Sequence, residues 1–266
     1  MPFYAHDGAP FGKDCRQGGL CGRRGPRGVA ERDGMDTIDL SWKRFLMPPM
    51  HPEGRRFVLV AAMLALLSGL LSPYLALFGI LLMLAVYLFF RDPERVPPLD
   101  PRTIVSPADG VVCLILRSPL PAELEAGDTP VWRVSVFMSV LNVHVNRMPA
   151  AGTIVKTRHI AGRFFNASLD KASEHNERQL YLMKADRGQT LAFVQIAGLI
   201  ARRIVRLARE GQRLACGERF GLIRFGSRVD VYLPAGVAPV VRVGQIMVAG
   251  ETPVARLDEP AGGDKT

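Results

Sequence analysis

The feature that most constrains this chain is an uncharged stretch of 34 residues, from Phe57 to Phe90, which reads FVLVAAMLALLSGLLSPYLALFGILLMLAVYLFF. As one helix it would extend about 51 Å, much more than the roughly 30 Å hydrocarbon core of a membrane. Ser72-Pro73 breaks the stretch into halves of 16 and 18 residues. We therefore expect a transmembrane or re-entrant helical hairpin over residues 57–90. The alternatives are one long kinked span or a buried core helix.

Positive charge lies at both ends of this stretch, at Arg55, Arg56, Arg91 and Arg95. Such charge favours the cytoplasmic side, which predicts that both ends and the domain that follows face the cytoplasm at the cell (inner) membrane. The whole chain carries a formal net charge of +9, which favours an anionic partner. Aromatic residues are not interleaved with the basic ones, so the sequence favours an anionic membrane over nucleic acid.

The composition divides the chain into four parts. Residues 1–34 are rich in Gly and Arg and predict a disordered tail. Residues 35–56 form a juxtamembrane segment, residues 57–90 the hairpin, and residues 91–266 one catalytic domain. The four cysteines form no CxxC pair. This excludes a disulfide-rich scaffold and a zinc finger, and no metal site is expected.

The apolar runs after residue 91 are short, rich in Val and Ile, and separated by Gly, Pro and Asp. Such spacing predicts a mainly β domain with a sandwich-like or barrel-like architecture. The expected strands lie within residues 103–107, 110–116, 131–140, 152–157, 180–185, 191–200, 221–226, 228–234 and 240–250. Residues 200–214, IARRIVRLAREGQRL, fit an amphipathic helix or a strand, and β-branched residues favour a strand through Val205.

Three short stretches suggest chemistry: SPADG (106–110), NVHVNRMP (142–149) and RFGSRVDVYLP (224–234). Each alone has an ordinary interpretation, as a turn or as a core histidine. Together they suggest that the hydroxyl of Ser227 attacks the carbonyl of Gly226, with His144 and Asp109 as base and orienting group. Elimination and hydrolysis would then leave a pyruvoyl group. This requires a fold that brings positions 109, 144 and 227 together.

Six motifs carry a resemblance to a known family: FFRDPER (89–95), SPADG, FMSVLNVHVNRMP (137–149), GRFFNASLDKASEHNERQ (162–179), GERFGLIRFGSRVDVYLP (217–234) and VGQIMVAGET (243–252). In one order over residues 40–255, they resemble phosphatidylserine decarboxylase in its short bacterial and archaeal form. The resemblance implies a proenzyme that cleaves itself between Gly226 and Ser227. The products would be a β chain ending at residue 226 and an α chain of residues 227–266, which together form a heterodimer.

The resemblance also implies the reaction. The pyruvoyl group made from Ser227 forms a Schiff base with phosphatidylserine and takes up the electron pair left by CO₂, and phosphatidylethanolamine is released. His144 is the candidate proton donor, and no metal or diffusible cofactor is implied. The long form has a second histidine where Arg147 stands here. Asp109 and Ser227 therefore carry over, and His144 is assigned to cleavage, decarboxylation or both.

Two other histidines and two other functions are alternatives. His175 is a substitute base, whereas His159 fits a surface or strand position. One rival function is a membrane-tethered lipoyl-like or phospho-accepting carrier module with His144 as acceptor. The other is a pyruvoyl decarboxylase of a soluble amino acid, which the apolar hairpin disfavours. The sequence leaves open whether the chain forms a homo-oligomer.

Overall fold

The computed structural model describes residues 29–32, 35–38, 48–162, 176–198, 203–224 and 227–257. The chain divides into two compact units, Met1–Asp39 and Leu40–Thr266. In the first unit, β1 (Val29–Arg32) pairs antiparallel with β2 (Met35–Ile38). Residues 29–32 belong to the segment that the composition predicts to be a disordered tail, and in the structure they form β1. The rest of the expected tail, residues 1–28 and 33–34, lies outside the described residues.

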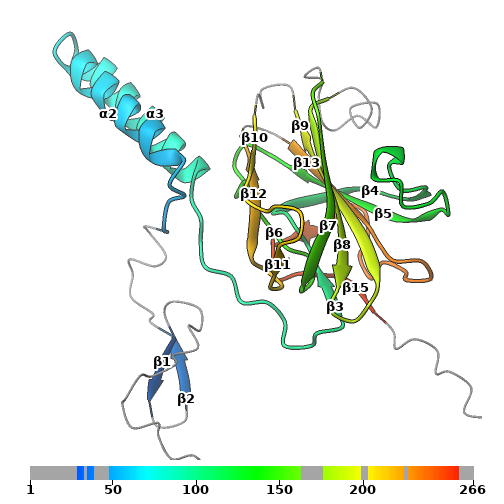
Figure 1. Cartoon of the computed structure of the whole chain (residues 1–266). Coiled ribbons are helices and arrows are strands. Elements are labelled where there is room, and N and C mark those ends of the chain that lie inside the picture. Colours follow the sequence, from blue (N-terminus) through cyan, green and yellow to red (C-terminus); the bar gives the residue numbers. More distant parts are fainter. Residues whose placement is uncertain are drawn as a thin grey trace, which may run out of the picture. The chain divides into compact units, whose positions relative to one another are not determined.

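The uncharged stretch forms two helices, α2 (Gly54–Gly69) and α3 (Pro73–Phe89). They lie side by side and are joined by residues 70–72 (Figure 1). The side chain of Ser72 accepts a hydrogen bond from the amide of Tyr74, and Pro73 occupies the first turn. Both features favour a helix start, as the break at Ser72-Pro73 predicted. We call residues 54–89 the helical pair.

The two helices approach closely at Gly79, where an added Cβ would lie 2.6 Å from the Cα of Ala65. Most other side chains of the helical pair are apolar and exposed, and Leu66 and Leu70 are 73% and 81% exposed. No helix in the described parts of the chain is long and apolar enough to span a membrane. With 16 residues in α2 and 17 in α3, the helices are close in length to the two halves of the uncharged stretch, and their insertion into a membrane stays a prediction.

The rest of the second unit is built from short strands and one turn of 3₁₀ helix. Their bounds are β3 Thr103–Val105, β4 Gly110–Ser118, η1 Ala122–Leu124, β5 Val131–Met138, β6 Val145–Arg147, β7 Gly152–Ile160, β8 Arg178–Ala185, β9 Thr190–Ala197, β10 Ile204–Arg206, β11 Arg213–Leu214, β12 Arg219–Ile223, β13 Ser227–Tyr232, β14 Ile246–Met247 and β15 Pro253–Arg256.

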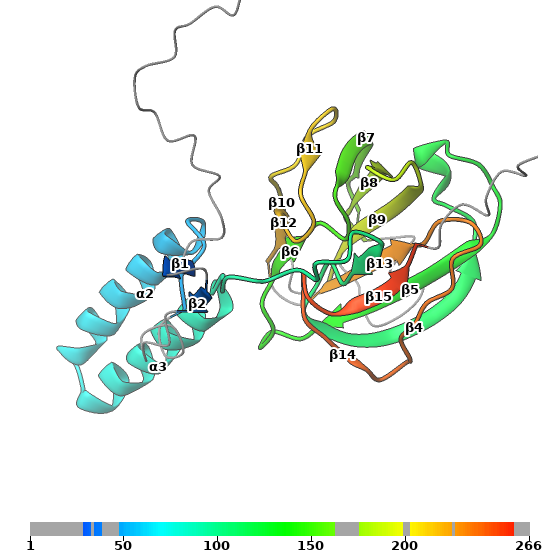
Figure 2. The same cartoon turned by 90° about the horizontal axis from the view of Figure 1, so that it is seen from below.

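Eight of these strands form one antiparallel sheet in the order β11-β7-β8-β9-β13-β5-β4-β14, which curls around a core (Figures 1 and 2). A three-stranded sheet, β10-β12-β6, and a two-stranded sheet, β15-β3, complete the described fold. The prediction of a mainly β domain is confirmed. The strand expected through Val205 is confirmed as β10 for residues 204–206, whereas residues 199–202 lie outside the described residues.

The large sheet buries both of its faces. The main core lies on one face and includes Val134, Val136, Val229 and Val231 of the central strands β5 and β13. Phe220 of β12 packs into this core, with its ring 4.7 Å from that of Phe193. A smaller apolar cluster covers the other face, below η1. Because side chains alternate along a strand, each residue of β13 can be assigned to one face.

Candidate active site

Ser227 is the first residue of β13 and lies in the middle of the large sheet. It pairs with Met138 on β5 and with Ala197 on β9, and both partners belong to the main core. Cross-strand partners share a face of the sheet, so Ser227 faces that core as well. Its side chain is fully buried, and its hydroxyl has no hydrogen-bond partner within the described residues. A buried hydroxyl without a partner is costly and needs an explanation. Ser135 of β5 shares this property, so the position of Ser227 in the cleavage motif distinguishes it. Gly226 lies outside the described residues.

His144 lies just before β6 and is fully buried. Its ring contacts the ring of Phe89, the last residue of α3, at a centroid distance of 4.2 Å. Its Nδ1 lies 2.9 Å from the carbonyl oxygen of Asn142. A carbonyl oxygen only accepts, so Nδ1 carries the proton and Nε2 is the basic nitrogen of the neutral ring. The helical pair therefore reaches directly to the imidazole.

Burial, together with a smaller effect of the Arg91 charge, lowers the pKa of His144 to about 4, against the opposing effect of the Asn142 carbonyl. The imidazole is therefore neutral at neutral pH. Arg91 is held near the ring by hydrogen bonds of 2.6 Å to the carbonyls of Leu88 and Leu141. A neutral imidazole can accept a proton, as a general base requires.

The sequence analysis placed Asp109 beside His144 and Ser227, but its carboxylate is held by two other groups. Its carboxylate accepts hydrogen bonds from the guanidinium of Arg95 and from the amide of Ala249, each at 2.7 Å. Burial raises the pKa of Asp109, and the charge of Arg95 and the amide of Ala249 oppose that rise. Within the described residues, these contacts do not link Asp109 to His144 or Ser227. The orienting group on the Nδ1 side of His144 is the carbonyl of Asn142, which sequence spacing did not reveal.

The three sequence motifs do meet through their backbones. The amide of Arg147 donates to the carbonyl of Pro107 at 2.9 Å, which joins NVHVNRMP to SPADG. The amide of Ile223 donates to the carbonyl of His144 at 3.2 Å, which joins NVHVNRMP to the strand that precedes Ser227. These backbone contacts make the segments neighbours, and convergence of the side chains of Asp109, His144 and Ser227 stays a prediction.

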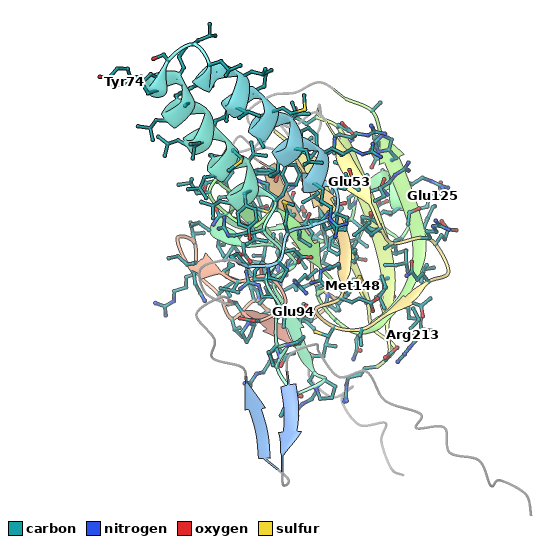
Figure 3. All side chains as sticks on the ribbon, turned by 90° about the vertical axis from the view of Figure 1, so that its left-hand side faces the viewer. Glu53, Tyr74, Glu94, Glu125, Met148 and Arg213 are labelled. Carbon is teal, nitrogen blue, oxygen red and sulfur yellow. The ribbon has the colours of Figure 1, made fainter. Side chains whose placement is uncertain are left out.

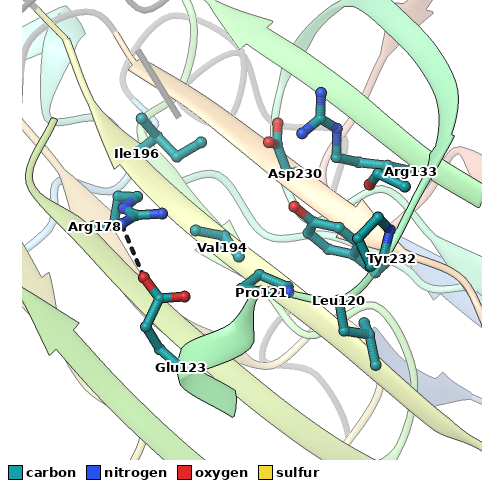
Figure 4. A pocket seen from close by; sticks show the side chains of 11 residues that line it. Leu120, Pro121, Glu123, Arg133, Arg178, Val194, Ile196, Asp230 and Tyr232 are labelled. Carbon is teal, nitrogen blue, oxygen red and sulfur yellow. Dashed lines mark hydrogen bonds and ion pairs between the residues drawn. The ribbon is translucent and has the colours of Figure 1, made fainter. Parts of the chain in front are cut away.

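Two cavities lie on different sides of this region. One, of about 660 Å³, is lined by Glu53, Arg56, Phe57, His159, Glu177, Arg203, Ile204, Val205, Arg206 and Arg224. The other, of about 240 Å³, is lined by Asp230 and Tyr232 among others and contains the ion pair of Arg178 with Glu123, at 3.0 Å (Figure 4). Asp230 lies on the face of β13 opposite Ser227, because the two are three residues apart on an alternating strand. The sheet therefore separates the smaller cavity from the hydroxyl of Ser227.

Comparison with known proteins gives the family. The model of the family described as phosphatidylserine decarboxylase matches residues 82–255. The phosphatidylserine decarboxylase proenzyme of Novosphingobium aromaticivorans is 50% identical over 241 residues, which cover 87% of this chain and 94% of that protein. The proenzyme of Ruegeria pomeroyi is 54% identical over 211 residues, with 79% and 96% covered. That of Erythrobacter litoralis is 50% identical over 241 residues, with 87% and 95% covered.

The chain belongs to the phosphatidylserine decarboxylase family. The resemblance inferred from the motifs is thereby confirmed, and so is the prediction that the chain is an enzyme. The matched range contains Asp109, His144, Gly226 and Ser227. The word proenzyme in the names of the relatives refers to a precursor that requires processing.

In this decarboxylase, Arg147 is a structural clamp. It is 4% exposed, and its guanidinium donates to Asp92 at 3.1 Å, to the carbonyl of Pro93 at 2.7 Å and to the carbonyl of Gly217 at 2.9 Å. Asp92 also accepts from Arg219 at 2.6 Å. Arginine stays protonated in proteins, so it cannot replace the second histidine of the long form as a base. It instead fixes the segment that leads from α3 into the β domain.

Of the two alternative histidines, the structure describes His159. It lies on β7, with its Nε2 3.8 Å from a carboxylate oxygen of Glu177, which confirms its strand position. His175 lies outside the described residues. The motif FFRDPER contains Asp92 and Arg95, but sequence reasoning did not predict that they hold Arg147 and Asp109. The sequence feature that could have indicated these roles is the group of charged residues directly after the uncharged stretch.

The low pKa of His144 has a measurable effect on stability. Below pH 6.5 the unfolded chain protonates this imidazole, whereas the folded chain does so only near pH 4. The unfolded state binds more protons in this window, so the free energy of unfolding falls as the pH drops from 6.5 towards 4. The expected loss is on the order of 3 kcal/mol.

Urea unfolding at several pH values measures this loss, in a Ser227→Ala background that keeps one chain. His144→Gln removes the titrating group, so we expect a weaker fall of stability in the double variant. An identical fall with and without the imidazole would contradict the assignment of a neutral buried His144.

Proposed function

We propose that the chain decarboxylates phosphatidylserine to phosphatidylethanolamine and CO₂, and that it uses a pyruvoyl group formed from its own Ser227. The observation that carries this proposal is the buried hydroxyl of Ser227, without a partner in the described residues, at the start of a central strand. Membership of the family supports the same reaction. Apart from the oxygen of Ser227, no side chain of β13 that faces the main core has a nucleophilic atom.

The proposed cleavage uses groups of the chain itself. The Ser227 oxygen attacks the carbonyl carbon of Gly226, and the peptide bond becomes an ester with a free amine on Ser227. A base removes the α-proton of Ser227, and the bond from its Cβ to the ester oxygen breaks, which releases a carboxylate on Gly226. The remaining dehydroalanine tautomerises to an imine, and water hydrolyses it to the pyruvoyl group and ammonia.

The residues around Ser227 fit this group. Its position facing the main core excludes bulk water, and His144 supplies a neutral imidazole joined by its backbone to the strand before Ser227. The pyruvoyl group supplies a carbonyl that condenses with the substrate amine and acts as an electron sink. His144 is our candidate to hold and return the proton that the α-carbon needs once CO₂ has left. An anionic headgroup beside the imidazole raises its pKa, which lets a proton reside on Nε2.

Intact mass and product analysis test the proposed function together. The purified protein is expected to contain an α chain of about 4.4 kDa, since residues 227–266 are 40 of 266 residues in a 29.2 kDa protein. Its N-terminus should resist Edman degradation and react with hydroxylamine. Phosphatidylserine labelled in the serine carboxyl should release labelled CO₂. Full activity at full mass would overturn the pyruvoyl assignment.

We further propose that the helical pair enters the cytoplasmic leaflet of the cell (inner) membrane as a re-entrant segment. The exposed leucines of α2 and α3 and the arginines at their base support this. Figure 3 shows Glu53 at the base of the helical pair and Tyr74 at its far end.

A cysteine placed on the exposed surface of the β domain, as in Arg242→Cys, tests the membrane topology. We expect a membrane-impermeant maleimide to leave it unlabelled in intact cells. The maleimide should label it once the cytoplasmic side of the membrane is made accessible. The native described cysteines are poor reporters, because burial raises the pKa of the Cys113 and Cys216 thiols. Labelling of intact cells from outside would contradict this topology.

A further inference from the structure

The larger cavity gathers arginines from three segments that are far apart in the sequence. Arg56 comes from the start of α2, Arg203 and Arg206 from the region of β10, and Arg224 from the end of β12. We propose that this arginine pocket binds the phosphodiester of the phosphatidylserine headgroup while the substrate reacts at Ser227. This inference rests on the proposed function and names the part of the substrate that the pocket holds.

The charges in the pocket do not cancel. Arg224 donates to the carboxylate of Glu53 at 2.5 Å, and Glu177 lies opposite His159 at 3.8 Å. Arg56, Arg203 and Arg206 have no ion-pair partner within the described residues and are exposed to solvent. Uncompensated guanidinium groups that line one pocket favour an anion, and arginine matches the oxygens of a phosphate better than lysine does.

The size of the pocket fits a headgroup rather than an ion. Its volume of about 660 Å³ lies within the range of small-molecule sites, roughly 300–1,000 Å³. Phe57 forms part of its wall and belongs to α2. A lipid whose phosphate lies among the arginines can place its acyl chains along the exposed leucines of the helical pair.

Neighbouring residues link the pocket to the candidate active site. The amide of Arg224 donates to the carbonyl of Arg203, so these two arginines are fixed to one another, and Arg224 precedes Ser227 by three residues. Phe57 stacks on Phe90 at 5.2 Å, and the neighbouring Phe89 contacts His144. Neither Ser227 nor His144 lines the pocket, so these neighbours are what links it to them. We infer that a headgroup bound by its phosphate extends from the pocket towards the two residues.

Charge also distinguishes substrate from product. The phosphatidylserine headgroup carries a phosphate, a carboxylate and an ammonium group, and its net charge is negative. Loss of CO₂ with uptake of a proton leaves a headgroup without net charge. A positive pocket therefore binds the substrate more tightly than the product, which favours product release.

Steady-state kinetics with short-chain, monomeric phosphatidylserine test the pocket, because they separate headgroup binding from membrane binding. We expect Arg203→Gln with Arg206→Gln to raise KM about tenfold and to change kcat less than about twofold. The double change to Lys keeps the charge and should restore part of the loss. Arg242→Gln removes an exposed arginine outside the pocket and should leave KM unchanged.

Inorganic phosphate and short-chain phosphatidylglycerol identify what the pocket binds. At constant ionic strength, both should compete with the substrate of the wild-type enzyme, and competition should weaken severalfold in the Gln variant. Activation by phosphatidylglycerol with an unchanged KM in the variant would mean that a second lipid occupies the pocket, which overturns the proposal. Absence of phosphate competition in the wild type also overturns it, even if the variant fails to mature.

The test of the arginine pocket can be distinguished from the test of the proposed decarboxylation. If the wild type releases no CO₂, the proposed function fails, and calorimetry with the Ser227→Ala proenzyme still tests the pocket. Binding of glycerol 3-phosphate that depends on Arg203 and Arg206 would then support the pocket. Binding that does not depend on them would overturn it.

Discussion

Ser227→Ala is expected to abolish both maturation and activity while leaving the fold intact. The variant lacks the attacking oxygen, so it should remain at 29.2 kDa and release no CO₂. The hydroxyl has no hydrogen-bond partner within the described residues, so its removal leaves no buried group newly unpaired. Intact mass spectrometry, CO₂ release and circular dichroism measure the three outcomes.

Ser135→Ala is the matched control. Ser135 is also fully buried on a central strand, and its hydroxyl also has no partner in the described part of the chain. It lies on β5 and alternates with Val134 and Val136, which places it on the face opposite the main core. We expect this variant to mature and to release CO₂ normally. A Ser227→Ala protein that still yields the small chain would disprove the cleavage assignment.

Arg147→Met should reduce the stability of the protein far more than any substitution of an exposed arginine. It removes the donor for Asp92 and for the carbonyls of Pro93 and Gly217, all from a side chain that is 4% exposed. Breaking one partner of a buried ion pair costs about 3–5 kcal/mol. We expect a loss of this size in urea unfolding of the Ser227→Ala proenzyme.

Two further variants serve as comparisons for that result. Arg242→Met removes an exposed arginine and should change stability by less than about 0.5 kcal/mol. Arg147→His restores the residue of the long form, but an imidazole carries fewer donors than the three contacts need. We expect it to be destabilised as well and to gain no activity. Normal stability of both Arg147 variants would show that the clamp contributes little.

Much of this fold follows from local patterns in the sequence. The runs of Val and Ile predicted the strands, and Ser72-Pro73 predicted the start of α3, because alternation and helix capping depend on neighbouring residues. The helices α2 and α3 have 16 and 17 residues, and whether they enter a membrane stays a prediction. Hydropathy alone does not show where a helix begins and ends.

The site was predictable only in part. The motifs identified Ser227, His144 and Asp109, but not the contacts that hold them. Arg147 reaches Asp92 and Gly217 across 55 and 70 residues, and Asp109 pairs with Arg95 across 14. These contacts depend on how the sheets pack. The arginine pocket is equally hidden, because its members come from three segments that only the fold brings together.

The position of Ser227 at the start of β13 has a consequence for the lifetime of the enzyme. If the chain is cut before this residue, the new small chain still supplies β13, paired on both sides by β5 and β9, as well as β14 and β15. It cannot leave without opening the central sheet. A reactive group built at its first residue therefore cannot be exchanged for a fresh one from solution. Chemical damage to that group would inactivate the enzyme molecule permanently, and only synthesis of a new chain would restore the lost activity.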